Sequence, residues 1–235
     1  MYICGKNVAK EYLNSNETVK KVYLMKNYND NEIISKLNEK TNNIEYVDKR
    51  ELDKITKENH QGVILCIEDF KYSDIDDIMK KDDSLIVILD HIEDPHNFGA
   101  IIRTCEAAGV DGIIIPKNRS VDVTPTVIRT SVGASKYVPI VQITNITSTM
   151  KELKKKGFWF IGTDMDGTPY DKIDYKGKIC IVIGSEGFGM SRIVKENCDF
   201  IATIPMNGKI NSLNASVAAG IVIYEAVKVR KQIEL

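Results

Sequence analysis

The stretch SLIVILDHIEDPHNFGAIIRTCEAAGVDGIIIP, residues 84–116, decides the fold class. Its first seven residues form an apolar run that suits a strand buried on both faces of a parallel sheet. A polar turn follows, then a helix that ends at Gly109, a typical C-cap, and then a second apolar strand. Further strands are expected at 137–142, 158–164, 178–184 and 200–206. We therefore predict an α/β domain built on a parallel-rich sheet.

The residues before this stretch predict a separate, smaller α/β domain. Helix signals at 5–13, 32–40 and 49–56 alternate with strand signals at 19–25, 44–47 and 62–68. Residues 1–72 carry twelve basic and twelve acidic side chains, whereas residues 73–83 carry two basic and five acidic ones. We expect 73–83 to be a solvated linker or surface helix, and 84–235 to be the second domain.

Composition limits the functions that the chain can have. The formal net charge of −1 gives no bulk attraction for nucleic acid, so RNA or DNA would have to bind a local patch. The five cysteines form no C-x-x-C pair and indicate a reducing, cytoplasmic compartment. The three histidines form no HExxH motif, so we expect no metal. No apolar run is long enough for a membrane span.

Three loops that follow predicted strands carry polar residues typical of ligand sites. They cover residues 94–99, 184–191 and 212–216. The carboxyl ends of parallel strands meet at one edge of a sheet, where ligands gather. Turn and helix-cap roles are the alternative for Asp94 and Asn97.

The glycine loop GSEGFGMS, residues 184–191, argues against two common nucleotide sites. Its Gly-x-x-Gly-x-Gly spacing matches a dinucleotide fingerprint only loosely, so an NAD-dependent oxidoreductase is a weak alternative. Glu186 would repel phosphate, and no Lys-Ser/Thr pair follows it, which disfavours a P-loop.

In order, the three loops contain D-P-x-N-x-G-x-x-x-R-T, I-G-S-E-G-x-G, and I-P-M followed by S-L-N-x-S. This order resembles the SpoU/TrmH (SPOUT) family of S-adenosylmethionine-dependent RNA ribose 2′-O-methyltransferases. The resemblance implies a deep trefoil knot in the C-terminal domain and a homodimer formed through that domain. It also implies that residues 1–72 form an RNA-binding module similar to the ribosomal protein L30e or L7Ae fold. The layout is similar to that of members that methylate a guanosine of 23S rRNA.

The same resemblance assigns roles to individual residues. It implies these catalytic residues: Asn97, Arg103, Glu186, Ser212 and Asn214. S-adenosylmethionine, which leaves as S-adenosylhomocysteine, would be bound by Thr163, Asp164, Ile183, Gly184, Glu186, Gly187, Ile204, Met206, Ser212, Leu213 and Asn214. Candidate RNA contacts are Arg103, Lys117, Arg119, Arg129, Lys136, His60 and Gln61. Solvated charges are the alternative for the basic residues, and turn residues for His60 and Gln61.

Physical chemistry constrains the catalytic roles. A guanidinium keeps its proton at neutral pH, so we expect Arg103 to hold the target phosphate and stabilise the developing alkoxide, not to act as a base. We expect Glu186 to accept hydrogen bonds from its surroundings and orient them, or only to stabilise its loop. A tRNA methyltransferase and a non-catalytic RNA-binding or ribosome-assembly protein remain alternatives to the rRNA enzyme.

Overall fold

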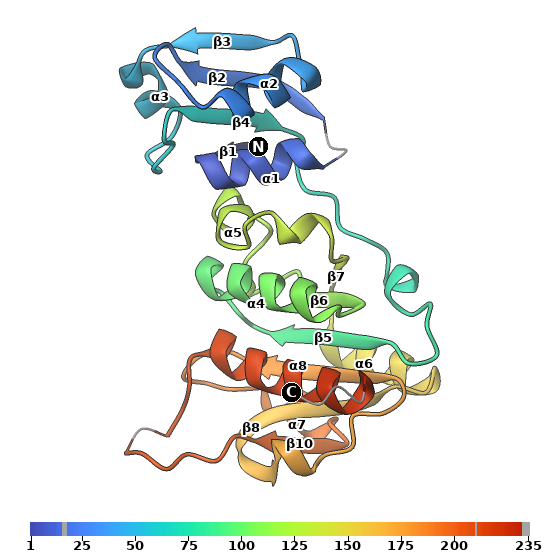
Figure 1. The fold of residues 1–235 in the computed structure, drawn as a ribbon. Helices are drawn as coiled ribbons and strands as arrows, with labels where there is room; N and C mark the ends of the chain where they lie inside the picture. Colours follow the sequence, from blue (N-terminus) through green and yellow to red (C-terminus); the bar gives the residue numbers. More distant parts are fainter. Residues whose placement is uncertain (16–17, 210, 232–235) are drawn as a thin grey trace. The chain divides into compact units, whose positions relative to one another are not determined.

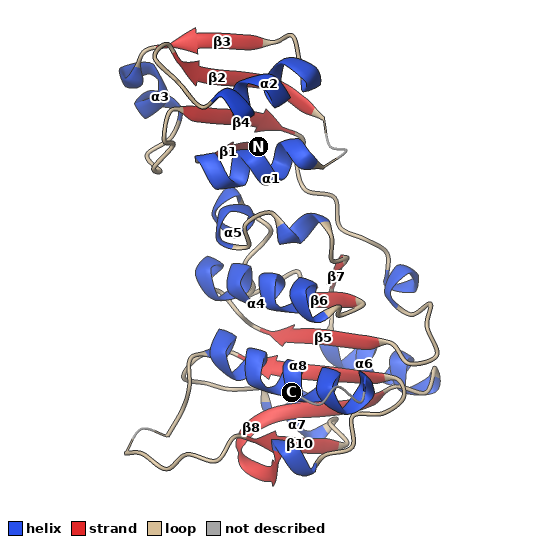
Figure 2. Cartoon of the chain, in the orientation of Figure 1, coloured by secondary structure: helices blue, strands red, loops and turns tan. Residues whose placement is uncertain are grey.

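The computed structural model describes residues 1–15, 18–209 and 211–231. The chain divides into two compact units. The first comprises Met1–Lys71 with Val123–Gly133, and the second Tyr72–Asp122 with Ala134–Leu235. The sequence placed 123–133 in the second domain, but the short helix α5 (Pro125–Thr130) in this segment contacts β1 (Tyr2–Cys4) of the first unit. Figures 1 and 2 show the elements along the chain and by type.

The first unit is a small α/β fold with a four-stranded sheet of order β1-β4-β2-β3. Only β2 and β3 pair in parallel. Its elements are β1 (Tyr2–Cys4), α1 (Lys6–Asn14), β2 (Val19–Met25), α2 (Asn31–Lys40), β3 (Ile44–Val47), α3 (Lys49–Ile55), β4 (Val63–Ile67) and α5 (Pro125–Thr130). The sequence predicted all of these before residue 70 except β1.

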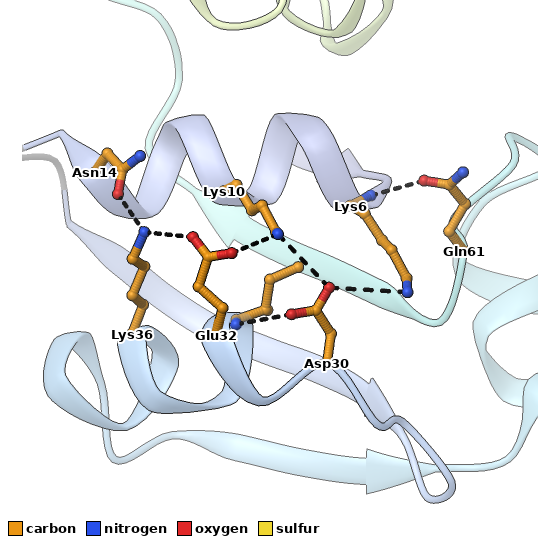
Figure 3. A network of polar contacts seen from close by, with 8 residues as sticks. Lys6, Lys10, Asn14, Asp30, Glu32, Lys36 and Gln61 are labelled. Carbon is orange, nitrogen blue, oxygen red and sulfur yellow. Dashed lines mark hydrogen bonds and ion pairs between the residues drawn. The ribbon is translucent and has the colours of Figure 1, made fainter.

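Helix caps and polar contacts fix the helices of the first unit. Asp48 and Glu51 form a capping box at the start of α3, whose Leu52 packs in the core. Figure 3 shows the polar contacts between α1 and α2, in which Glu32 accepts hydrogen bonds from Lys10 and Lys36. These two ammonium groups lower the pKa of Glu32 to about 2.

The second unit is built on a six-stranded sheet of order β10-β8-β9-β5-β6-β7, in which every pair is parallel. Its strands are β5 (Leu85–Asp90), β6 (Gly112–Pro116), β7 (Ile140–Ile143), β8 (Trp159–Pro169), β9 (Ile179–Gly184) and β10 (Phe200–Thr203). Its α-helices are α4 (Pro95–Ala108), α6 (Ile146–Lys155), α7 (Arg192–Glu196) and α8 (Ala215–Lys231). Three 3₁₀ helices complete it: η1 (Ile75–Ile78), η2 (Ala134–Lys136) and η3 (Tyr170–Lys172). The predicted parallel α/β domain is confirmed; the trefoil knot stays a prediction.

Both faces of the second sheet are covered. All six residues of β5 are buried, as expected for a strand between two layers. Ile86 and Ile88 pack in a core with Met150 of α6 and Val194 of α7. Helices α4 and α8 contact each other. In addition, α4 contacts β6, and α8 contacts β9.

The segment 73–83, expected to be a solvated linker or a surface helix, contains the 3₁₀ helix η1 with exposed acids, but it also packs against the second sheet. Ser73 N donates to Ile140 O at 2.8 Å, and Ile78 is 1% exposed in the core with Ile86 and Ile88. Gly112 lies against Ile78, where an added Cβ would come within 2.2 Å of Ile78 Cγ2. Its acids face solvent, whereas Ile78 is buried and Ile75 is half-buried against the same core, so counting charges alone obscured its packing role.

Candidate active site

Neighbouring strands bring the predicted loops together. These loops follow β5, β9 and β10, and because every strand pair of this sheet is parallel, all three leave the same edge, with β9 directly beside β5. In the loop after β5, Asp94 Oδ1 accepts hydrogen bonds from His96 N at 2.7 Å and Asn97 N at 2.8 Å. Asp94 is thus the N-cap of α4, which leaves the buried Asn97 side chain in the first helical turn.

Asn214 joins the three loops. Its Oδ1 accepts hydrogen bonds from Ser216 N at 3.0 Å and Ser216 Oγ at 2.6 Å, which makes it a cap for α8. Its Nδ2 donates to Asn97 Oδ1 at 2.9 Å and to Glu186 Oε1. Glu186 Oε1 also accepts a hydrogen bond from Ala215 N at 3.3 Å. The helix cap therefore orients an amide that holds Asn97 and Glu186 in one cluster.

The glycine loop is a tight hairpin. Ser185 N donates to Gly189 O at 3.0 Å, and Gly189 N donates to Ser185 O at 2.9 Å. A Cβ on Gly184 would lie 2.2 Å from the Gly189 carbonyl carbon, so this close approach requires glycine. The tip of the hairpin carries Glu186 toward Asn214 and leaves Phe188 94% exposed.

A buried carboxylate fixes the end of this hairpin. Asp90, the last residue of β5, is 0% exposed and accepts Ser191 N at 2.6 Å, while its other oxygen contacts His91 Nδ1. The sequence analysis singled out neither Asp90 nor Phe188. Two sequence features mark these residues: Asp90 is an acid at the end of an otherwise apolar strand, and Phe188 is an aromatic residue inside a glycine loop.

A cleft of about 450 Å³ runs beside Glu186 and Asn214. All eleven residues that the family resemblance assigned to the cofactor line it: Thr163, Asp164, Ile183, Gly184, Glu186, Gly187, Ile204, Met206, Ser212, Leu213 and Asn214. Met206 and Leu213 are each 37% exposed, so the cleft has apolar walls that are only partly covered.

Asp164 is held in one orientation at this cleft. It accepts hydrogen bonds from Met165 N at 2.7 Å and forms an ion pair with Lys195 at 2.8 Å. Burial raises the pKa of Asp164, but its bonds with Lys195 and the Met165 amide outweigh burial and hold that pKa below the ordinary value. The cleft therefore keeps a charged acceptor beside Thr163.

Arg103 lies apart from this cluster. It is exposed on α4 and lines neither the cofactor cleft nor a second cleft beside Glu186, described below. It makes no hydrogen bond or ion pair with the residues that the structure describes. Within one chain, Asn97, Glu186 and Asn214 therefore lie together. Ser212 lines the cofactor cleft, whereas Arg103 is not part of this cluster.

The predicted RNA contacts are divided between the two units. Lys117 and Arg119 are exposed after β6 of the second unit, which also holds the half-buried Lys136. In the first unit, Arg129 forms an ion pair with Glu58.

His60 and Gln61, also in the first unit, stabilise local structure. His60 is 6% exposed, with Nε2 3.0 Å from Asp53 Oδ1 and Nδ1 accepting Gly62 N at 3.0 Å. Gln61 Oε1 accepts Lys6 N at 2.8 Å at the start of α1. These contacts favour the turn-residue alternative for both.

Other predicted features can be compared directly with the structure. All five cysteines are free thiols. Within the described ranges, no group of three or more His, Cys, Asp or Glu side chains is placed to hold a metal ion. Among those same residues, no helix has the length and apolar character that crossing a bilayer requires.

Known proteins resemble the whole chain. The SpoU rRNA Methylase family model matches residues 84–224, and an RNA 2′-O ribose methyltransferase substrate-binding model matches residues 2–73. A Staphylococcus haemolyticus protein named for the TrmH family of tRNA/rRNA methyltransferases is 42% identical over 98% of this chain and 96% of its own length. The similarly named YacO of Bacillus subtilis is 39% identical, covering 99% and 97%.

Solved structures show the same likeness. The SpoU methyltransferase AviRb from Streptomyces viridochromogenes, crystallised with AdoMet, has a TM-score of 0.85 and 25% identity, covering 97% of this chain and 89% of its own. An AdoMet-bound rRNA methyltransferase from Sinorhizobium meliloti has a TM-score of 0.82 and 26% identity, covering 100% and 88%. The chain therefore belongs to the SpoU rRNA methylase family of RNA methyltransferases.

Proposed function

We propose that this chain transfers a methyl group from S-adenosylmethionine to a ribose 2′-hydroxyl of RNA and releases S-adenosylhomocysteine. One observation carries the proposal: Asn214 Nδ2 donates to both Asn97 Oδ1 and Glu186 Oε1 at the edge of the cofactor cleft. Both units also match models named for this enzyme class.

The cleft fits S-adenosylmethionine in its chemistry. Ile204, Met206 and Leu213 offer apolar walls that a flat adenine ring would cover, and Gly184 and Gly187 allow close approach to the main chain. Asp164 provides a fixed carboxylate on the same wall. When bound, the cofactor would supply a methyl group activated by a positively charged sulfur: the methyl carbon would be the electrophile for the ribose 2′ oxygen, and the sulfur would leave as the thioether of S-adenosylhomocysteine.

Positioning of the ribose oxygen is the main task of the polar cluster. Because Asn97 Oδ1 is occupied by Asn214, the Asn97 Nδ2 group is the end that can donate to a substrate oxygen. Glu186 accepts from Asn214 Nδ2 and Ala215 N, which suits an orienting carboxylate more than a general base. Ser212 lies on the cleft wall, where its hydroxyl can donate to or accept from either ligand.

Arg103 lies away from the polar cluster within one chain, so a second molecule has to bring it there. Its exposed guanidinium can hold the phosphate next to the target ribose and stabilise negative charge on the 2′ oxygen. We infer that RNA, or a second copy of the chain in a homodimer formed through the C-terminal domain, brings Arg103 to the cluster. Val217 and Tyr224 of α8 are exposed apolar side chains that such a dimer would cover.

We place the enzyme in the cytoplasm, with a guanosine of 23S rRNA as its target. The substrate-binding match over residues 2–73 supports an RNA substrate, and an AdoMet-bound neighbour is titled an rRNA methyltransferase. tRNA is the second candidate, because the relatives with 39–42% identity are named for both RNAs. The intact Asn97–Glu186–Asn214 cluster argues against a non-catalytic RNA-binding protein.

Methyl transfer to separated RNA pools tests the proposal. The full chain is incubated with methyl-labelled S-adenosylmethionine and unmodified tRNA, 16S rRNA or 23S rRNA. We expect label in 23S rRNA. Label only in tRNA would overturn the substrate assignment, and no label in any pool would overturn the catalytic proposal.

Cofactor choice can be measured separately by thermal shift. A ligand that binds only the folded state stabilises it by about 2.7 kcal/mol at a hundredfold excess over Kd. We expect S-adenosylmethionine and S-adenosylhomocysteine to raise Tm, and NAD to leave it unchanged. A shift with NAD alone would favour the oxidoreductase alternative.

A further inference from the structure

A second cleft, of about 510 Å³, lies on the other side of Glu186 from the cofactor cleft. The two clefts share Glu186 and Phe188, and the second adds Asn97, His91 and Arg119 to its walls. A group that enters it therefore reaches the same Asn97–Glu186 cluster that borders the cofactor. None of the family-assigned roles uses His91 or Phe188.

Hydrogen bonds fix the three loops that frame this second cleft. Ser191 N, at the end of the glycine loop, donates to Asp90. The loop after β6 is tied to the loop after β5 through Ile92 O, which accepts Val121 N at 3.0 Å and Ser120 Oγ at 3.3 Å. The walls of the second cleft are thus held in place before a ligand arrives.

Two wall residues adopt an uncommon backbone. His91 has φ 62° and Arg119 has φ 52°, in the left-handed region that non-glycine residues seldom occupy. Such conformations are energetically unfavourable for residues with a side chain and concentrate at functional sites. His91 is held by its contact with buried Asp90, and Arg119 directly precedes Ser120, which bonds Ile92.

Phe188 presents an uncovered aromatic ring at the mouth of both clefts. It is 94% exposed, although burying an aromatic side chain of this size is favourable. An aromatic ring on a rigid hairpin is the usual platform for an unpaired base, which it binds by stacking.

Arg119 supplies the charge that a phosphate needs. It is exposed and makes no hydrogen bond or ion pair with any residue in the described part of the chain. The acids on the same walls are Glu93, Asp94 and Glu186, of which Asp94 caps α4 and Glu186 is held by Asn214. A guanidinium can bind phosphate with two parallel hydrogen bonds. Arg119 can therefore hold a phosphate through direct contact even though acidic residues also line the cleft.

We propose that the second cleft receives the target nucleotide in an unpaired state, with its base stacked on Phe188 and its phosphate bound by Arg119. This inference rests on the proposed methyl transfer and identifies how the acceptor is held. A base inside a duplex cannot stack on Phe188, so the substrate is a loop, bulge or flipped nucleotide. The ribose between base and phosphate is then placed beside Asn97 and Glu186.

Substitutions at Phe188 test the stacking. Filter binding with unmodified 23S rRNA and tRNA transcripts, in the presence of S-adenosylhomocysteine, gives the RNA Kd of the full chain. We expect Phe188→Ala and Phe188→Leu to weaken binding on the order of tenfold, and Phe188→Trp to retain it, because stacking needs a π face. Equal binding by the Ala, Leu and Trp variants and the wild type would overturn the stacking role.

Substitution at Arg119 tests the phosphate contact. Arg119→Ala should weaken RNA binding and reduce the slope of log K against log salt by about one. Arg119→Lys should restore the salt slope and part of the affinity. The matched control is Lys151→Ala, which removes an exposed charge from α6, whose residues line neither cleft. Equal losses from Arg119→Ala and Lys151→Ala would contradict a specific contact.

Parallel measurements separate this inference from the proposed function. If Phe188→Ala loses affinity for S-adenosylmethionine but keeps its RNA Kd, Phe188 is only a cofactor wall and the inference fails. If the wild type methylates RNA while the Phe188 and Arg119 variants bind RNA normally, the inference fails and the function stands. If those variants lose RNA binding but the wild type transfers no methyl group, the nucleotide site stands without the chemistry. A wild type that neither binds nor methylates RNA contradicts both.

Discussion

Asn214 caps α8 with one end of its side-chain amide and holds Asn97 and Glu186 with the other. The cap fixes which end faces each partner, because Oδ1 is occupied by the helix amides. A small polar residue at a helix start therefore serves stability and site geometry together. These two tasks can be separated by substitution.

Asn214→Asp should keep the cap but lose the site. An aspartate still accepts from the α8 amides, yet it replaces the Nδ2 donor with an oxygen that repels Glu186. We expect methyl transfer to fall by about 10²-fold or more, in the range seen when a catalytic hydrogen-bond donor is removed. Tm should change less than in Asn214→Ala, which also loses a cap worth about 1 kcal/mol. Near-native turnover by Asn214→Asp, measured with labelled cofactor, would contradict this role.

Some of the site residues were predicted from the sequence, and others were not. The motif residues Asn97, Glu186 and Asn214 were predicted from the family resemblance, and the fold brings them together. Asp90 and Phe188 could not be singled out, because the sequence reveals neither the complete burial of one nor the exposure of the other. The role of Arg103 stays a prediction, since it lines neither cleft and makes no hydrogen bond or ion pair in the described chain.

At the scale of elements, the hydrogen bond from Ser191 N to Asp90 connects the glycine loop to the central strand β5. The loop leaves β9, which pairs with β5 along its whole length. Asp90 thus fixes the hairpin that carries both Glu186 and Phe188.

Asp90→Ala should destabilise the chain and loosen this hairpin. Removing a buried acceptor leaves the Ser191 amide without its partner, at a cost of about 1–3 kcal/mol in the free energy of unfolding. We expect a lower urea midpoint and weaker S-adenosylmethionine binding, with Asp90→Asn intermediate. The matched control is Asp174→Ala, which removes an exposed carboxylate that accepts Lys176 N at 3.1 Å. Equal midpoints for the Asp90 and Asp174 variants would contradict the proposed role.

The contacts between α1 and α2 in Figure 3 predict a pH dependence. The Glu32 pKa falls from an ordinary 4.5 to about 2, so its stabilising contribution is fully present above pH 4.5 and is lost as pH falls toward 2. Glu32→Gln should lower Tm at pH 7, and its difference from wild type should shrink below pH 4.5 and in high salt. Glu39→Gln, an exposed change on the same helix, serves as control. A difference that is independent of pH would show that the contacts stabilise by packing alone.

Local patterns predicted most elements but not all of their partners. Apolar runs identified the strands from β5 to β10, and Gly109 ended α4 as expected. Strand β1 was missed because three residues carry no periodic signal. The packing of 123–133 with the first unit was missed because it depends on contacts with residues more than fifty positions away, such as Thr126 Oγ1 with Glu58 at 2.8 Å.

At the scale of the whole molecule, each unit matches a model with its own name, one for substrate binding and one for methyl transfer. The net charge of −1 predicted neither role, because a total says nothing about where single cationic residues such as the exposed Arg119 lie. The clefts that carry the proposal both lie within the second unit. The substrate-binding match lies over residues 2–73, most of which belong to the first unit.

The position of the transferred methyl group tests the central claim most directly. RNA labelled by the wild-type chain is hydrolysed with alkali, which cleaves next to a free 2′-hydroxyl but not next to a 2′-O-methyl group. We predict that the label is recovered in alkali-resistant dinucleotides, and that Asn214→Asp removes it. Label recovered only in mononucleotides would place the methyl group on a base and contradict the account.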